Sequence, residues 1–291
     1  MKRVLLCAAA VALSQIATAP NASADEITLG TAGAFAVLGA STVTNTGATT
    51  LNGNLGVYPG TSITGLGTIT LTGTVHATDG VASTAQADAT IAYNAMASAL
   101  STSNLTGQDL GSVGTLNAGV YTFTSSAQLT GHLTLDFQGL SNRDIIFQIG
   151  STLTTASGSS VSIINLGSND NVYWQVGSSA TLGTSTSFMG DIIALASVTM
   201  TTTAKDSCGS VIALTAAVTL DTNTISNTCA IVDSSGTTIG TLGGTVTGTT
   251  TENQAVPEPG TFLLLGTGIA GLVARRRRWA LGRQLDIALK A

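Results

Sequence analysis

The chain has 291 residues, enough for one large domain or two small ones. Hydrophobic residues make up 43% of it and charged residues only 9%, and the small aliphatic residues are scattered among Thr and Ser, which favours many short strands. Between residues 25 and 252 only Arg143 and Lys205 are cationic, against thirteen acids, so the chain cannot neutralise a row of phosphates and nucleic-acid binding is excluded.

The N-terminus has the pattern of a secretory signal peptide. Lys2 and Arg3 precede an apolar stretch at 4–13, and the small residues at 22–24 supply a cleavage site. We expect cleavage between Ala24 and Asp25, so that residues 1–24 form the signal peptide and the mature chain is exported. No cofactor is expected, since the two histidines and the cysteines form no cluster with metal-ligand spacing.

One segment near the front predicts a helix. Residues 81–100 contain no Gly or Pro and are rich in Ala, and apolar residues recur in them at helical spacing: Ala85, Ala89, Ala92, Met96 and Leu100. Ser83 or Thr84 could cap the start of this helix. We expect one amphipathic helix that covers apolar surface along the rest of the fold.

The middle of the chain carries degenerate repeats. Four segments share the pattern Thr-(Leu/Met)-x-Thr, and they begin at Thr152, Thr181, Thr199 and Thr219. The blocks 190–208 and 209–229 also align, and FQIGS at 147–151 returns as WQVGS at 174–178. A repeat of about 20 residues with short β-branched strands is typical of one coil of a β-solenoid. The Leu or Met of each repeat should point inward and the Thr on either side outward. The uneven spacing suggests that some coils are stacked out of sequence order.

Two cysteines would survive removal of the signal peptide. Cys208 and Cys229 end the two aligned blocks, so they should lie one coil apart. That separation suits a disulfide, and an exported protein meets an oxidising compartment. We expect a structural disulfide between them.

The C-terminus has the pattern of a sorting signal. Pro257, Glu258 and Pro259 precede an apolar run at 261–274, and a cluster of four arginines begins with Arg275 and Arg276. This order resembles the PEP-CTERM tag of Gram-negative bacteria, which addresses proteins to the cell surface or extracellular matrix. The resemblance implies export and sorting machinery as partners and transient membrane anchoring through 261–274.

These signals divide the chain. We expect a signal peptide at 1–24, a folded domain at 25–233, a Gly/Thr-rich flexible linker at 234–255, the sorting segment at 256–278 and a basic tail at 279–291.

Three stretches of the folded domain resemble the microbial ice-binding-like family. They are AFAVLGASTVTNTGATTLNGNLGVYPGTSITG at 34–65, NVYWQVGSSATLGTSTSFMGDIIALASVTM at 171–200 and AAVTLDTNTI at 216–225. The resemblance implies a mainly β fold, a right-handed, triangular, discontinuous β-solenoid with one long α-helix packed alongside. It also implies a flat Thr-rich face with the loose motif Thr-(Ala/Gly)-x-(Thr/Asn), through which characterised members bind ice.

Candidate residues for this face follow from that motif. Thr46-Gly47-Ala48-Thr49 fits it fully, and the other aligned positions keep a small, Thr-rich character but not the strict motif. Lys205, which follows one of them, would disturb a flat face if it points outward. The resulting candidates are Thr46, Thr49, Thr155, Ser157, Thr184, Thr186, Thr202, Ala204, Thr222 and Thr224.

Two functions remain open. The first is non-enzymatic adsorption to an ice crystal surface, and the second is a matrix or adhesion role in which the same fold contacts extracellular polysaccharide. An enzyme is not expected, because no nucleophile motif appears and neither His has a local acid partner. Either function places the protein outside the cell or on the surface of a Gram-negative bacterium.

Overall fold

The computed structural model describes residues 27–232 and 238–242. The chain divides into two compact units, Met1–Thr245 and Val246–Ala291, and every described residue belongs to the first. The predicted signal peptide, sorting segment and basic tail lie outside the described residues. One part of the predicted linker, Thr238–Leu242, forms a strand (β26) that pairs antiparallel with β25 (Cys229–Val232), so this part is not an unstructured spacer.

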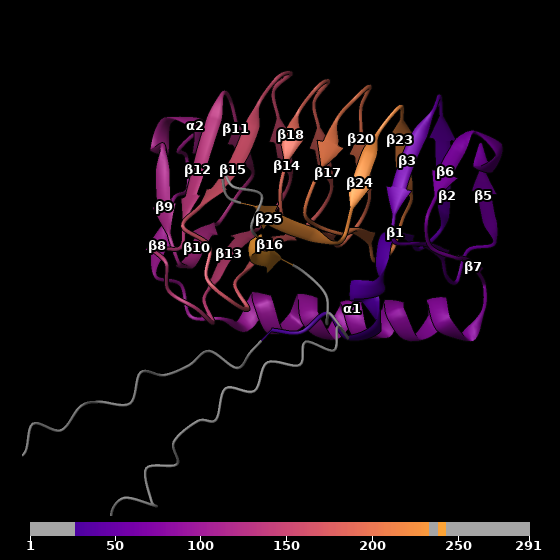
Figure 1. Cartoon of the computed structure of the whole chain (residues 1–291), viewed down its shortest axis with the longest axis horizontal. Helices are drawn as coiled ribbons and strands as arrows, with labels where there is room; N and C mark the ends of the chain where they lie inside the picture. Colours follow the sequence, from indigo (N-terminus) through magenta and orange to yellow (C-terminus); the bar gives the residue numbers. More distant parts are fainter. Residues whose placement is uncertain (1–26, 233–237, 243–291) are drawn as a thin grey trace, which may run out of the picture. The chain divides into compact units, whose positions relative to one another are not determined.

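The described chain is wound into coils, and each complete coil places one strand in each of three parallel sheets, while the two end coils are incomplete (Figure 1). In spatial order, sheet A contains β7 (Val75–Ala77), β4 (Asn54–Val57), β1 (Phe35–Gly39), β22 (Val211–Ala213), β19 (Asp191–Ala194), β16 (Asn171–Val176), β13 (Asp144–Ile149), β10 (Gly119–Phe123) and β8 (Ser103–Asn104). Sheet B contains β11 (Ala127–Leu129), β14 (Leu153–Thr155), β17 (Ala180–Leu182), β20 (Val198–Met200), β23 (Val218–Asp221), β2 (Thr42–Thr46) and β5 (Ser62–Thr64). Sheet C contains β6 (Ile69–Leu71), β3 (Thr49–Asn52), β24 (Thr224–Ser226), β21 (Lys205–Asp206), β18 (Ser187–Phe188), β15 (Ser160–Ile164), β12 (His132–Asp136) and β9 (Thr115–Asn117).

The coils are not stacked in sequence order. The coil of β22, β23 and β24 pairs on one side with the coil before it in the sequence, as the aligned blocks predict, with Ile192 opposite Val211. On its other side it pairs with the N-terminal coil of β1, β2 and β3, where Val43 lies opposite Val218. The predicted discontinuity is therefore confirmed, and the mainly β solenoid fold with it.

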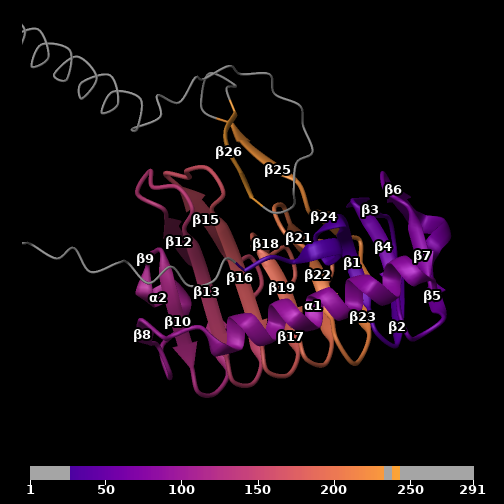
Figure 2. The same ribbon diagram turned by 90° about the horizontal axis from the view of Figure 1, so that it is seen from below.

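One long helix returns the chain from one end of the solenoid to the other. Helix α1 (Gly80–Ser98) follows β7 and precedes β8, the two edge strands of sheet A (Figure 2). Its 19 residues span about 28 Å, and the nine strands of sheet A span about 38 Å, so a few extended residues complete the distance. Three short helices also occur in the described chain: η1 (Gly30–Ala34), η2 (Leu66–Thr68) and α2 (Leu110–Val113).

The start and end of α1 differ from the sequence prediction. The helix begins one residue earlier, and Asp79 caps it by accepting a hydrogen bond from the Ala82 amide at 2.8 Å, so neither Ser83 nor Thr84 is the cap. Leu100 lies beyond the helix end and is 87% exposed, whereas the other four predicted apolar positions are buried.

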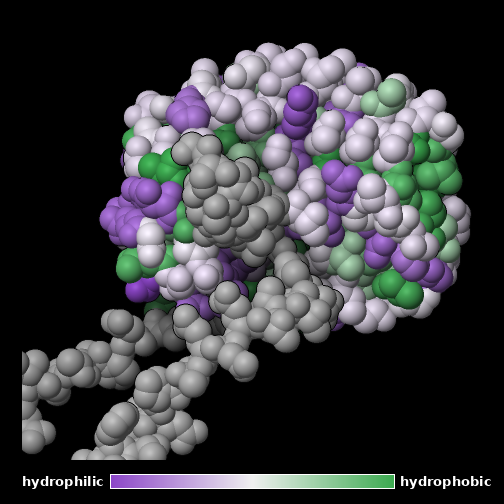
Figure 3. Space-filling view, viewed as in Figure 1, coloured by the Kyte–Doolittle hydropathy of each residue, from purple (hydrophilic) through white to green (hydrophobic). Residues whose placement is uncertain are grey.

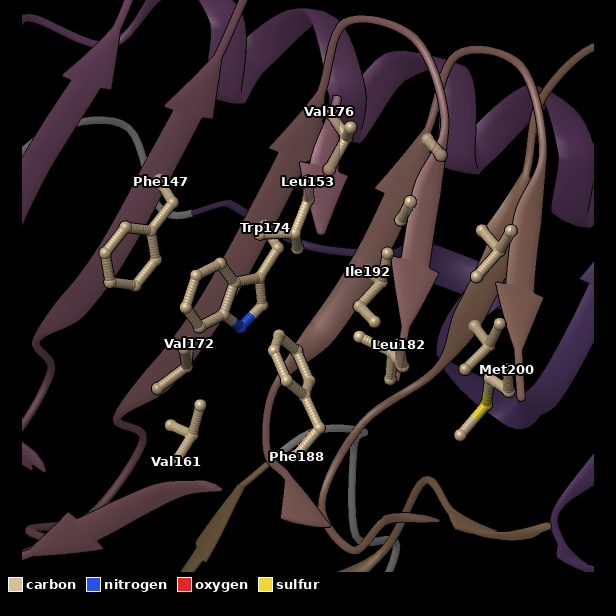
Figure 4. Packing of buried hydrophobic residues seen from close by; sticks show 14 of the residues in the cluster. Phe147, Leu153, Val161, Val172, Trp174, Val176, Leu182, Phe188, Ile192 and Met200 are labelled. Atoms are coloured by element: carbon tan, nitrogen blue, oxygen red, sulfur yellow. The ribbon is translucent and has the colours of Figure 1, made fainter. Parts of the chain in front are cut away.

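The core is filled by stacked side chains from successive coils. The repeat FQIGS/WQVGS places Phe147 opposite Trp174 in sheet A, and their rings stack with centroids 3.8 Å apart (Figure 4). Tyr121 stacks on the other face of Phe147, and Phe188 contacts Trp174 from sheet C. Each coil therefore completes its apolar interior only against its neighbours.

Candidate functional site

Sheet A has no free face. Its inner side faces the core, and its outer side packs against the buried face of α1, with Ala85, Ala89 and Met96 in one apolar cluster with Ile146 and Ile193 (Figure 2). Two glutamines bind the helix to the sheet region by hydrogen bonds. Gln148 Nε2 donates to the carbonyl oxygens of Met96 and Ala99 at 2.8 and 2.7 Å, and Gln86 Nε2 donates to the Ala213 carbonyl at 3.2 Å.

Sheet C is exposed but chemically mixed. One outward row runs through His132, Ser160, Ser187, Lys205 and Thr224. His132 lies among hydroxyl groups, with its Nδ1 2.7 Å from Ser160 Oγ. The view of Figure 3 shows hydrophilic residues dispersed among pale ones, with the larger hydrophobic areas towards the two ends. A cation and a histidine thus interrupt any regular pattern on this sheet.

Sheet B presents one residue type in a single row. The central outward residues of its strands lie opposite one another in register, and six of the seven are threonines: Thr154, Thr181, Thr199, Thr219, Thr44 and Thr64, with Gln128 beside Thr154 at the end. We call the six threonines the threonine row. Neighbouring members belong to adjacent strands, so they repeat about every 4.8 Å.

The hydroxyls of the threonine row have no hydrogen-bond partner among the described residues. By contrast, four of the residues two positions earlier in the sequence, on the side of sheet A, form hydrogen-bonded pairs: Thr152 Oγ1 donates to Ser126 Oγ at 2.8 Å, and Ser197 Oγ donates to Ser179 Oγ at 3.0 Å. The row can therefore bind water with every hydroxyl, while β-branching keeps each side chain in few rotamers.

The ten residues predicted for this face lie elsewhere, at the corner between sheets B and C and in the adjoining strands. Four of them are buried and so contact no solvent: Thr49, Thr155, Thr186 and Ala204. Thr155 Oγ1 bonds to Thr186 Oγ1 at 2.8 Å inside the corner, and Thr49 Oγ1 donates to Asn45 Oδ1 at 2.6 Å. For these four positions the prediction of an exposed face is wrong, because inward and outward residues alternate through the corner.

The other six predicted residues are at least partly exposed, but they do not form one plane. Thr46 ends β2, Ser157, Thr184, Thr202 and Thr222 follow strands of sheet B, and Thr224 belongs to sheet C. Thr202 and Thr222 donate hydrogen bonds to Asp221, at 2.5 and 3.1 Å. Lys205 points outward on sheet C, away from the threonine row.

The threonine row was missed because the family motif directed attention to the Thr residues that follow each inward Leu or Met. Leu182, Met200 and Leu220 point inward in register, as predicted, and in these three repeats the Thr before the inward residue belongs to the row. In the first repeat Leu153 lies opposite Ala180 and Thr154 lies opposite Thr181, so the predicted alignment of that repeat is wrong by two residues and its row member is the Thr after Leu153.

The titratable groups of the described residues include one ion pair and two buried aspartates with strongly raised pKa values. Their His, Cys, Asp and Glu side chains contain no group of three that could hold a metal ion. His76 Nδ1 lies 2.7 Å from Asp79 Oδ2 beside the start of α1, so the prediction that neither His has a local acid partner is wrong for His76. The hydrogen bond from the capped Ala82 amide and, after it, this contact lower the pKa of Asp79. Burial raises the pKa of Asp191 to about 7 and that of Asp206 well above its ordinary value.

Two further predictions concern the cysteines and the membrane. Cys208 is buried and disulfide-bonded, but the side chain of Cys229 lies outside the described ones, so their pairing stays a prediction. No helix within the described residues is long and apolar enough to cross a membrane, and the apolar run at 261–274 is outside them.

Comparison with known proteins places this geometry in a family. The ice-binding-like family model matches residues 37–226, and the PEP-CTERM protein-sorting motif matches residues 255–278. An ice-binding protein of Nostoc sp. (strain HG1) is 46% identical over 97% of this chain and 98% of its own length. The crystal structure of an ice binding protein from an Antarctic biological consortium aligns with a TM-score of 0.64 and 38% identity, over 77% of this chain and 95% of that one. The ice-binding protein of the Antarctic ascomycete Antarctomyces psychrotrophicus aligns with a TM-score of 0.61 and 36% identity, over 69% and 97% of the two chains. This chain belongs to the ice-binding-like family.

Proposed function

We propose that the protein is an exported, non-enzymatic ice adsorber and that sheet B is the surface that contacts ice. The observation that carries the proposal is the threonine row, in which six side chains of one type stand in register and their hydroxyls have no partner among the residues that the structure describes. The ice-binding names of the relatives support the same function.

The physical argument rests on a rigid grid. Neighbouring strands set a spacing of about 4.8 Å across the sheet, and alternate residues along a strand set one of about 6.6–7 Å. A threonine offers a methyl group that gains from leaving liquid water and a hydroxyl that can anchor an ordered water. Because the solenoid already fixes these groups, ordering water on them costs little conformational entropy of the protein.

The alternative faces support adsorption less well. Sheet A is covered by α1, and sheet C carries Lys205 and His132 in its central row. A charged ammonium group is strongly hydrated and would have to give up water to lie against ice.

The sorting motif supports a location outside the cytoplasm. Its match at 255–278 fits the pattern of the sorting segment at 256–278 and suggests that the protein is secreted or held at the surface of a Gram-negative bacterium by the export and sorting machinery. Transient anchoring through 261–274 and a Cys208–Cys229 disulfide belong to the same proposal. An adhesion role on extracellular polysaccharide is the competing outcome of the test below.

Two tyrosine substitutions in one coil test the choice of face. Thr219 on sheet B and Thr224 on sheet C are both exposed, and neither hydroxyl has a protein partner among the described residues. Thr219→Tyr should reduce thermal hysteresis and ice-crystal shaping to those of a control protein of equal mass, while Thr224→Tyr should leave both unchanged. Loss of activity in Thr224→Tyr alone would move the surface to sheet C. A wild-type protein without hysteresis or crystal shaping would favour the adhesion role.

A further inference from the structure

Sheet B carries a single charged residue among its described strands, Asp221 at the end of β23. It follows Thr219 by two positions, so its side chain points to the same outward side, and it lies opposite Thr46 of β2. Residues two positions after each member of the threonine row and after Gln128 lie on the side of sheet C: Thr130, Ala156, Gly183, Thr201, Asp221, Thr46 and, at the end, the exposed Leu66. We call this the C-side row.

The carboxylate of Asp221 has hydroxyl partners but no cation among the described residues. Thr202 Oγ1 donates to Oδ2 at 2.5 Å, and Thr222 Oγ1 donates to Oδ1 at 3.1 Å. These hydrogen bonds lower the pKa of Asp221, so the group is ionised at neutral pH. Its remaining lone pairs face water, and no Lys, Arg or His side chain in the described part of the chain balances its charge.

An ionised carboxylate resists being pressed against ice. It orders water in its own shell, and removing that shell without an opposing charge costs free energy. The ice lattice accommodates ions poorly, so it does not replace the lost hydration. Liquid-like water should therefore persist around Asp221 and along the neighbouring part of the C-side row, which includes Thr201 and Thr46.

The row on the opposite side has no such obstacle. Residues two positions before each member of the threonine row and before Gln128 are neutral, and none is buried: Ser126, Thr152, Ser179, Ser197, Ala217, Thr42 and Ser62. We call this the A-side row. It extends the threonine row towards sheet A with small, mostly hydroxylated side chains.

Taking sheet B as the adsorbing surface, we propose that Asp221 sets the margin of the ice contact and restricts it to the threonine row and the A-side row. The native protein thus uses two of the three outward rows of sheet B. Neutralising Asp221 extends the contact over the C-side row and strengthens adsorption.

The test measures thermal hysteresis of the full chain with Asp221→Thr, at equal protein concentration and neutral pH. This change removes the charge and places a threonine between Thr201 and Thr46. Hysteresis should rise about 1.5-fold, the ratio of three contacting rows to two. Because Asp221→Thr also removes the acceptor of Thr202 and Thr222, the melting temperature is recorded for each variant. Asp221→Asn retains the side-chain shape and one acceptor oxygen, and it should also exceed the wild type.

A matched control is available on sheet C. Asp136 ends β12, is similarly half-exposed, and accepts hydrogen bonds from the Gln138 amide and Asn165 Nδ2 at 2.8 and 2.9 Å. Asp136→Thr should leave hysteresis unchanged. If Asp221→Asn and Asp221→Thr both fold but stay at or below the wild-type value, or if only Asp221→Thr rises, the charge of Asp221 does not set the margin. These results are distinct from failure of the proposed function, in which the wild type itself shows no hysteresis or Thr219→Tyr has no effect.

Discussion

The stability of the protein should fall as pH rises from about 4 to about 7, because two buried aspartates must ionise without a counter-charge. Asp191 at the start of β19 is 4% exposed, and Asp206 in β21 is 0% exposed. Asp191 Oδ1 accepts a hydrogen bond from the Ser210 amide at 2.9 Å, whereas Asp206 Oδ2 has no hydrogen-bond partner within residues 27–232 and 238–242. Burial raises the pKa of Asp191 to about 7, and burial together with the charge of Asp191 raises the pKa of Asp206 well above its ordinary value.

The direction of this pH dependence of stability follows from how many protons the folded and unfolded states bind. Below the ordinary pKa of 3.8, the folded and unfolded states both hold these protons, and this pair gives no pH dependence. Above it the unfolded chain loses the protons first, so the folded state binds more of them and its stability falls with rising pH. Each carboxyl contributes a slope of about 1.4 kcal/mol per pH unit. For Asp191 the loss between 3.8 and about 7 amounts to about 4 kcal/mol, and Asp206 continues to lower stability above that range.

Urea denaturation at a series of pH values between about 4 and about 8 measures this slope. The double variant Asp191→Asn/Asp206→Asn should lose most of this slope and exceed the wild type at neutral pH. Burial also raises the pKa of Asp170, so this group retains a smaller slope of the same sign. Asp136→Asn, which changes a half-exposed carboxyl on sheet C, should keep the wild-type slope. Carboxyls with lowered pKa values, such as Asp79 and Asp109, act in the opposite direction below their ordinary pKa of 3.8, outside the measured window. A wild-type profile that is flat, or a slope that is undiminished in the double variant, would refute the reasoning.

Three further substitutions test the packing of the solenoid. Trp174→Ala removes the fully buried ring at the centre of the aromatic stack and should lower the free energy of unfolding by about 3–5 kcal/mol. A loss under about 1 kcal/mol would contradict a central role of this ring in the core. Gln148→Ala removes the side-chain donor from the carbonyls of Met96 and Ala99 and leaves Met96 only the Ala99 amide, so it should cost about 1–3 kcal/mol. Amide hydrogen exchange in the last turn of the helix should become faster, and unchanged exchange would count against this role. Gly60→Ala would place a Cβ 1.8 Å from the Ser41 carbonyl oxygen and should cost about 3 kcal/mol of unfolding free energy. In the control Gly67→Ala, the new Cβ meets nothing within 4 Å, and stability should hardly change. Equal melting temperatures for the two variants would contradict the tight contact at Gly60.

Several structural features were predictable because they depend on local pattern. The long helix follows from an Ala-rich stretch without Gly or Pro, and its buried residues recur at the spacing of one helix face. The stacking of Phe147 on Trp174 follows from a short repeated sequence. The cap of α1 was misplaced because Asp79 precedes a glycine, and the Ala-rich pattern begins only after it.

What the sequence by itself determined is the kind of fold, through a coil repeat and an alternation of inward Leu or Met with outward Thr, together with the sorting motif near the C-terminus. What only the tertiary structure decided is which threonines share one flat sheet. Alternation has a period of two, so an error of one residue exchanges the inside for the outside. Long-range contacts fix that phase at the corner of sheets B and C. Asn223 Nδ2 donates to the carbonyls of Thr201 and Ala204, both at 2.9 Å, and thereby turns Ala204 inward. Because the N-terminal coil joins the stack beside β23, Thr44 and Thr219 become neighbours although they are far apart in the sequence. In the same pair of strands, Thr46 Oγ1 donates a hydrogen bond to the Leu220 carbonyl across a sequence separation of 174 residues.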